Sequence, residues 1–129
     1  MENDQQRLTS IMSNPICDGQ ALQAIRLIAE NLPLVVANGQ NETARQNLQY
    51  AATTAGWAFT IAQVGLAHAM AHTLGILHNV PHGVACGLML PGVMRYNVDH
   101  ATKKLALAAQ ALGVNTAELS ERDAALAAA

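Results

Sequence analysis

The feature that most restricts the fold of this chain is a long internal segment without charge. Between Arg45 and Arg95 the sequence contains no aspartate, glutamate, lysine or arginine. Such a segment is expected to be buried in a protein core or embedded in a bilayer, because charged side chains normally cover water-exposed surface. Residues 55–77 are long enough to cross a bilayer, which needs about 20 apolar residues. We therefore consider both environments.

Polar side chains inside residues 55–77 weigh against a membrane hairpin. Each of them would be costly in hydrocarbon without a partner, and they include Thr60, Gln63, His68, His72 and Thr73. We expect a deeply buried helical core that contains a polar site and no membrane span. A membrane hairpin remains the alternative.

Composition favours a helical bundle. Hydrophobic residues make up 51% of the chain and aromatic residues only 3%, so alanine and aliphatic side chains must form the interior. Alanine has the highest helix propensity, and its small side chain lets helices approach closely. Strands would need more aromatic and β-branched residues in alternation. We predict a single all-α domain over residues 1–129.

The expected helices follow from capping and turn residues. A first helix is predicted to begin at Gly19 or Gln20 with Asp18 as its cap, and to kink or end at Pro33. A second is predicted to begin after Asn41 and to reach about Gly65. A third helix is predicted over Leu66–Leu74, capped by Gly75. A fourth is predicted to begin at Pro81 or His82 and to end at Leu90 or, past a kink at Pro91, at Tyr96. The last two are Thr102–Leu112, ended by Gly113, and Glu121–Ala129, capped by Ser120.

Charge and cysteine content exclude some functional classes. The formal net charge is −2, and no basic patch is present, so we expect no nucleic-acid partner. Cys17 and Cys86 are far apart and form no CxxC motif, which predicts two free thiols in a cytoplasmic protein. Residues 1–7 are polar and predict no signal peptide.

Histidines are concentrated in the uncharged segment. Four of the five lie within fifteen residues, namely His68, His72, His78 and His82. Positions four apart share one helix face, so the first two side chains point the same way. His82 follows a short turn at Pro81, from which a second helix could direct it at the first. Because imidazole binds several transition metals, the group predicts a metal site.

A different interpretation of these histidines remains open. Each could be a core residue satisfied by one hydrogen bond, or part of a weak adventitious metal site. His78, beside Asn79, looks like a loop residue, and His100, after Asp99, looks like a surface residue. We expect both to be bystanders.

These motifs closely resemble the signature of iron-containing alcohol dehydrogenases. The resemblance covers residues 13–113 and rests on the segments Gly65–Gly75, Val80–Gly83, Leu90–Pro91 and Arg95–Asn97, with further similarity at Asn14–Asp18, Ala24–Ile25, Leu32–Pro33, Ala44–Arg45 and Ala55–Phe59. It implies the all-α C-terminal domain of the dehydroquinate synthase-like fold.

The resemblance also implies a chemistry. The family holds a divalent metal, usually iron (Fe2+) and sometimes zinc (Zn2+), with one aspartate and three histidines, and the last two histidines match His68 and His82. His72 matches a site histidine that lies beside the metal and nicotinamide without being a regular ligand, which makes it a candidate for proton relay. The metal polarises the alcohol oxygen while hydride passes to NAD(P), which is bound mainly by a separate N-terminal α/β domain.

The sequence departs from the family at its N-terminal side. The family's first two ligands form an Asp-x-x-x-His motif, whose histidine would fall near Asn3 and whose aspartate would precede Met1. Asp4 does not fit, since Leu8 stands four residues later. The resemblance therefore predicts a truncated dehydrogenase that lacks the nucleotide-binding domain, keeps two metal ligands, does not bind NAD(P) and is inactive alone.

We expect such a chain to form a homo-oligomer or to use the missing N-terminal domain as a partner, because surfaces normally covered would be exposed. The alternative is a non-enzymatic helical binding or assembly module built on the same scaffold.

Overall fold

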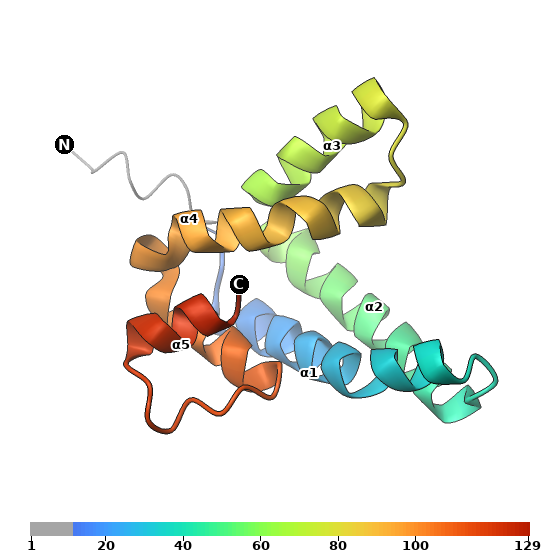
Figure 1. The fold of residues 1–129 in the computed structure, drawn as a ribbon, viewed down its shortest axis with the longest axis horizontal. Helices are drawn as coiled ribbons and strands as arrows, with labels where there is room; N and C mark the ends of the chain where they lie inside the picture. The colour runs from blue at the N-terminus through green and yellow to red at the C-terminus, as the bar shows by residue number, and fades with distance from the viewer. Residues whose placement is uncertain (1–11) are drawn as a thin grey trace.

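Five helices make up the part of the chain that the computed structural model describes, residues 12–129. They are α1 (Pro15–Ala37), α2 (Glu42–Ala62), α3 (Leu66–His78), α4 (His82–Ala111) and α5 (Glu121–Ala127). The described residues contain no strand, which confirms the predicted all-α class. Figure 1 shows α1 and α2 as a hairpin, α3 folded back towards α4, and α5 against the C-terminal half of α4.

The start of α1 differs from the prediction. Asn14 caps the helix, and its side-chain oxygen accepts hydrogen bonds from the backbone N–H groups of Ile16 at 3.0 Å and Cys17 at 3.3 Å. Pro15 occupies the first turn, where its missing N–H leaves no bond unmade. Asp18 is therefore inside the helix and not its cap. The helix also continues through Pro33 to Ala37, although an interior proline removes one backbone hydrogen bond and crowds the preceding turn.

The second helix begins as predicted, and the third ends later than predicted. Asn41 accepts a hydrogen bond from the Ala44 N–H at 3.1 Å and caps α2, which ends slightly early, at Ala62. The third helix passes through Gly75 to His78 and is capped by Asn79, whose φ of 53° is left-handed. Asparagine tolerates this conformation and so replaces glycine as the cap. His78 is consequently the last residue of α3, and the prediction of a loop position was wrong.

The two helices predicted on either side of residues 97–101 form one element, α4, with a kink at Ala101, directly before the predicted start at Thr102. Pro91 lies inside it, and the only non-helical dihedrals are at Ala101, with φ −130° and ψ 24°. Gly113 follows the helix with a φ of 88°, which glycine adopts without strain, and this confirms its predicted role. The cap of α5 is also confirmed, because Ser120 Oγ accepts from the Asp123 N–H at 3.1 Å.

Alanine forms most of the core. The fully buried side chains include Ala51, Ala71, Ala85, Ala109 and Ala125, each at 0% exposure. Between α1 and α2 the buried side chain of Asn31 accepts a hydrogen bond from Asn47 at 3.0 Å and donates to the Leu27 carbonyl at 2.8 Å. This pairing avoids the cost of an unsatisfied buried amide.

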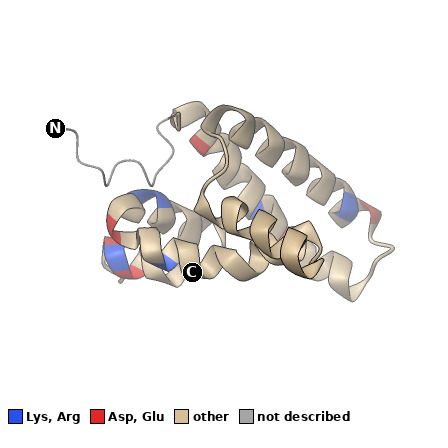
Figure 2. Cartoon of the chain, turned by 90° about the horizontal axis from the view of Figure 1, so that it is seen from above, with Lys and Arg blue, Asp and Glu red and all other residues tan. Residues whose placement is uncertain are grey.

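The uncharged segment is not deeply buried, so that expectation was wrong. Large apolar side chains within it are mostly solvent-exposed, including Trp57 at 62%, Ile76 at 82%, Leu77 at 70% and Leu88 at 63%. Helix contacts cover mainly the alanine faces and leave the larger side chains outside. Figure 2 colours the positions of charged residues along the ribbon, and the sequence places none of them in α2 after Arg45, in α3 or in the first turns of α4.

A bilayer-crossing helix is not found in the described part of the chain. No single helix there is long and apolar enough, and α2 with α3 meets the length and hydropathy requirements only as a pair bent by 107°.

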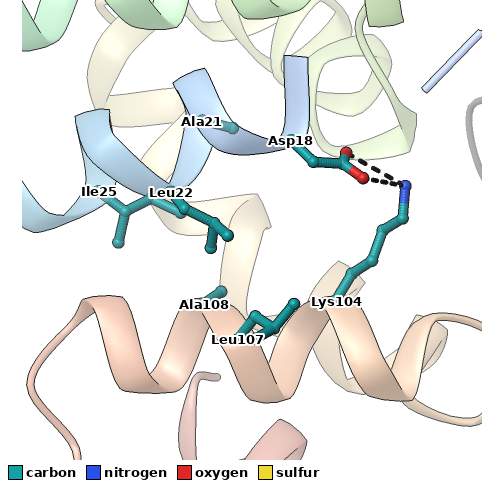
Figure 3. A pocket seen from close by; sticks show the side chains of 7 residues that line it. All are labelled: Asp18, Ala21, Leu22, Ile25, Lys104, Leu107 and Ala108. Carbon is teal, nitrogen blue, oxygen red and sulfur yellow. Dashed lines mark hydrogen bonds and ion pairs between the residues drawn. The ribbon is translucent and has the colours of Figure 1, made fainter. Parts of the chain in front are cut away.

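An ion pair connects α1 with the C-terminal half of α4. Lys104 Nζ lies 3.0 Å from one carboxylate oxygen of Asp18 and 3.2 Å from the other, and it also contacts Ser13 Oγ. Ser13 donates a hydrogen bond of 2.7 Å to the same carboxylate. Asp18 and Lys104 line an apolar pocket of about 190 Å³ between the two helices, and Figure 3 shows this pair beside the other lining residues.

Several effects act on the pKa of Asp18. Partial burial raises it, but the hydrogen bonds from Ser13 and Lys104 and the positive charge of Lys104 outweigh burial, so the pKa lies below its ordinary value. The folded state therefore binds this proton less readily than the unfolded chain. The resulting stabilisation is present above the unfolded pKa of about 3.9 and is lost as the pH falls through the lower, folded value.

The substitution Asp18→Asn is expected to lower the free energy of unfolding at pH 7 by about 0.5 kcal/mol, a small effect because the pair is partly exposed and screened by water. Thermal unfolding followed by circular dichroism at pH 7 and at pH 2.5 would measure it. The difference should shrink at pH 2.5, because the carboxyl of the unmodified chain is increasingly protonated as the pH falls. Glu30→Gln, on the same helix, is the control, and an equal loss in both variants would contradict the assignment.

Candidate metal centre

Two helices and the turn between them position the histidines. His68 and His72 occupy successive turns of α3, and His82 is the first residue of α4. The chain reverses at Asn79, whose left-handed backbone ends α3, and at Pro81, which precedes α4. Gly75 lies close to this turn, since a Cβ there would meet the Val80 carbonyl oxygen at 3.4 Å. The left-handed backbone of Asn79 and the turn at Pro81 allow α4 to return beside α3.

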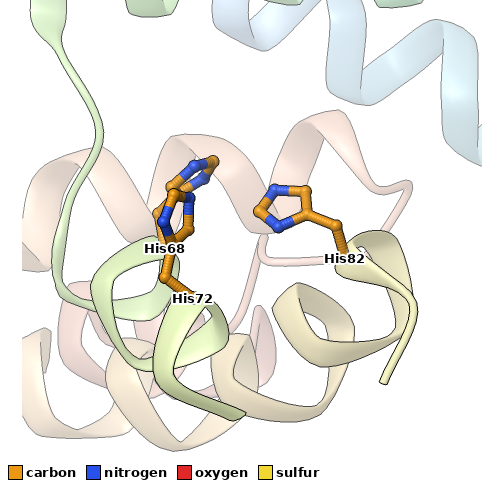
Figure 4. Close-up of side chains that lie close together, drawn as sticks. All are labelled: His68, His72 and His82. Carbon is orange, nitrogen blue, oxygen red and sulfur yellow. The ribbon is translucent and has the colours of Figure 1, made fainter. Parts of the chain in front are cut away.

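The three imidazoles converge on one place. Ring centroids are 4.8 Å apart for His68 and His72, 4.6 Å for His68 and His82, and 5.4 Å for His72 and His82. One ring nitrogen from each lies within 4.8 Å of the others. Figure 4 shows His82 from α4 facing the pair from α3. The structure therefore brings together the three site histidines that the sequence singled out.

The two other histidines lie outside this cluster. His78 is exposed at the end of α3, and His100 is exposed in α4. Neither belongs to the metal-ligating group that the described residues form. The positions near Asn3, Asp4 and Leu8, where the first ligand motif was sought, lie outside the described residues.

The cluster is open to solvent. His72 and His82 are exposed and His68 is half-buried, which differs from the buried polar site that the uncharged segment predicted. The pKa of His68 is lowered, first by desolvation and then by the neighbouring charges of His82 and His72. A lowered pKa favours the neutral form of this ring, which is the form that binds metal.

The donor set fits a divalent transition metal. Neutral imidazole is a ligand for iron, zinc, copper and nickel, whereas magnesium and calcium prefer oxygen donors. The cluster offers three nitrogen donors and contains no carboxylate from the described residues. The arrangement can therefore hold a borderline divalent ion with at least one coordination position left for another molecule.

Sequence reasoning missed one neighbour of the cluster. Cys86 Sγ lies 3.4 Å from His82 Nε2, one turn along α4. Cys86 and Cys17 are both free, as predicted. The four-residue spacing between His82 and Cys86 was a signal that could have placed the thiol beside the site.

Comparison with known proteins gives one family. The family description "Fe-containing alcohol dehydrogenase family, C-terminal" matches residues 6–129. A 1,3-propanediol dehydrogenase of Citrobacter freundii is 51% identical over 113 residues, which cover 88% of this chain and 29% of that protein. The bifunctional aldehyde-alcohol dehydrogenase AdhE of Escherichia coli is 44% identical over 99 residues, covering 75% of this chain and 11% of that protein.

A solved structure shows the same helical arrangement. The alcohol dehydrogenase from Oenococcus oeni matches with a TM-score of 0.90 and 44% identity, over 96% of this chain and 33% of that one. The chain thus spans about a third or less of the length of these similar proteins.

Proposed function

The chain belongs to the iron-containing alcohol dehydrogenase family, and from this we propose that it supplies the metal-binding helical part of an enzyme that oxidises alcohols or reduces aldehydes with NAD(P). The observation that supports this most strongly is the convergence of His68 from α3 and His82 from α4, whose ring centroids are 4.6 Å apart. These two positions match the last two metal ligands of the family motif.

In this proposal His68 and His82 hold a divalent ion, iron or zinc, through neutral ring nitrogens. When bound, the ion supplies Lewis-acid polarisation of the substrate oxygen. The two ligands come from different helices, so the packing of α3 on α4 fixes the distance between them. The half-buried position of His68 limits its movement, while His82 at the open side leaves access for substrate.

His72 acts as a proton relay. It lies one turn from His68 on the same face of α3, with its ring centroid 4.8 Å from that of His68. Its ring is exposed, so it can exchange a proton with water after taking it from the substrate hydroxyl. Imidazole suits this role because it is both donor and acceptor near neutral pH.

The complete reaction needs groups that these residues do not provide. Two imidazoles would hold iron(II) weakly, because a catalytic metal site normally has three or more protein ligands. The remaining ligands and the NAD(P)-binding surface come from further polypeptide, joined to this chain or separate. The isolated 129 residues are then without dehydrogenase activity. Free Cys17 and Cys86 are consistent with a reducing compartment, and we place the protein in the cytoplasm.

Exposed apolar side chains supply the surface for this association. Trp57, Ile76, Leu77 and Leu88 are all more than half exposed. We propose that a second copy of the chain or the complementary domain covers them, since water contact with large apolar patches is unfavourable. The same exposure favours the second candidate function, a non-enzymatic assembly module, in which association would not depend on the histidines.

Metal titration of His68→Ala and His82→Ala tests the proposed ligands. Each change is expected to weaken zinc binding at least about 10- to 100-fold, since even the loss of groups that only support metal ligands has effects of this size. Isothermal titration calorimetry of the purified, tag-free chain would measure it. His78→Ala, on the same helix and outside the cluster, is the control. Unchanged affinity and metal content in both ligand variants would favour the assembly module instead.

A further inference from the structure

The three imidazoles form a site that is more complete than two ligands and a relay. We propose that His72 is a third protein ligand when no group outside the histidine cluster coordinates the ion. The chain by itself then holds a borderline divalent cation such as zinc or cobalt with three nitrogens. This rests on the proposed function only in taking His68 and His82 as the other two ligands. The inference assigns His72 to direct coordination of the metal, which a proton relay does not require.

The geometry of the cluster places all three histidines around one position. Their nitrogens all lie within 4.8 Å of one another, and the ring centroid of His72 is 4.8 Å from that of His68 and 5.4 Å from that of His82, against 4.6 Å between His68 and His82. A tetrahedral ion with bonds of about 2.0–2.1 Å separates its ligand nitrogens by about 3.3 Å. Rotation of the side chains, two of which are exposed, can close the remaining gap without moving a helix.

The helix register favours three ligands as well. His68 and His72 are four residues apart on α3, a spacing that lets two imidazoles bind one ion from the same face. His82 completes a triangle from the adjacent helix. A third nitrogen raises the number of protein ligands to that of many open zinc sites, which keep the fourth position for water. Solvent access at the exposed rings of His72 and His82 leaves room for that water.

Cys86 is the competing ligand. Its sulfur is 3.4 Å from His82 Nε2, but it is not part of the group whose ligand atoms all lie within 4.8 Å. Cobalt(II) distinguishes the two arrangements, because coordination by sulfur produces an intense charge-transfer absorption in the near ultraviolet that a site made of nitrogen and oxygen lacks.

Zinc and cobalt titrations of the purified chain test the proposal. His72→Ala is expected to weaken zinc binding at least about 10-fold, by the same reasoning as for the other ligands, while His78→Ala leaves it unchanged. Nitrogen NMR of the imidazoles should show metal-induced shifts for His68, His72 and His82 together. Circular dichroism of each variant verifies that the fold is retained, and His72→Gln provides a second, polar replacement.

The outcomes separate this inference from the proposed function. If His72→Ala and His72→Gln bind zinc as the unmodified chain does, while His68→Ala and His82→Ala do not, the third ligand is refuted and the two-ligand proposal stands. A sulfur-to-cobalt band that Cys86→Ser removes would also refute the three-nitrogen site. Equal weakening in all three histidine variants, without such a band, supports it.

Discussion

Leucine in place of Ala71 is expected to lower the free energy of unfolding by about 1–3 kcal/mol, the usual effect of forcing extra methylenes into a packed interior. Ala71 is completely buried on α3, and α4 is the main packing partner of that helix. A larger side chain there must push α3 and α4 apart. Because His68 and His72 are on one of these helices and His82 is on the other, zinc binding should weaken at least about 10-fold, as when groups that support metal ligands are lost.

Urea unfolding and zinc calorimetry on the same samples would measure both effects. The matched control is Ala69→Leu, which adds the same atoms to an exposed position of the same helix, next to His68. It should change the unfolding free energy by no more than about 0.5 kcal/mol. If Ala71→Leu retained both stability and zinc affinity, the close contact of α3 with α4 would not be what positions the histidines.

Dehydrogenase activity is expected only when the remaining parts of a family enzyme are supplied. We predict no alcohol-dependent reduction of NAD or NADP by the purified chain with iron or zinc. Joining it to all the parts of the Citrobacter freundii 1,3-propanediol dehydrogenase that lie outside the shared region, within which the two are 51% identical, should produce turnover within the ordinary enzyme range of about 1–10³ s⁻¹. The reason is that, under the proposed function, the other metal ligands and the nucleotide-binding surface come from the added parts.

Absorbance of the reduced nicotinamide with 1,3-propanediol as the trial substrate would follow this reaction. In the joined protein His68→Ala should abolish turnover, and His72→Ala should lower kcat by roughly 10²-fold, the lower end of the contribution of a general acid–base group. His78→Ala should have no effect. Robust metal-dependent turnover by the purified chain alone would contradict the proposal.

Local signals predicted most of the helices. Asn41 and Ser120 were identified as caps because their side chains can accept from free backbone N–H groups, and both do so. The errors occurred where a stronger signal lay nearby. Asn14 caps α1 before Asp18 can, and Asn79 ends α3 although Gly75 was the expected stop. A glycine inside a helix costs about 1 kcal/mol, which favourable residues around it can offset.

The sequence predicted where the candidate site lies but did not predict its exposure to solvent. The spacing of His68 and His72 defines a helix face, and the Pro81 turn directs His82 back towards it, so their proximity followed from local structure. Burial depends on which surfaces are covered by other segments, and periodicity contains no information about those. For this reason the uncharged segment was expected to be interior, whereas Trp57 and Leu88 are exposed.

The connection between α1 and α4 has a consequence for cooperativity. The α1–α2 hairpin joins the other helices mainly through the contact of α1 with α4, where Asp18 and Lys104 form their partly exposed ion pair. Regions joined by so small a contact tend to open as separate units. The hairpin can therefore fluctuate or rearrange against a new neighbour while α3 and α4 keep the three imidazoles in register. We therefore expect that a partner bound at the hairpin would leave zinc affinity unchanged, and that bound metal would leave the hairpin free to take a partner.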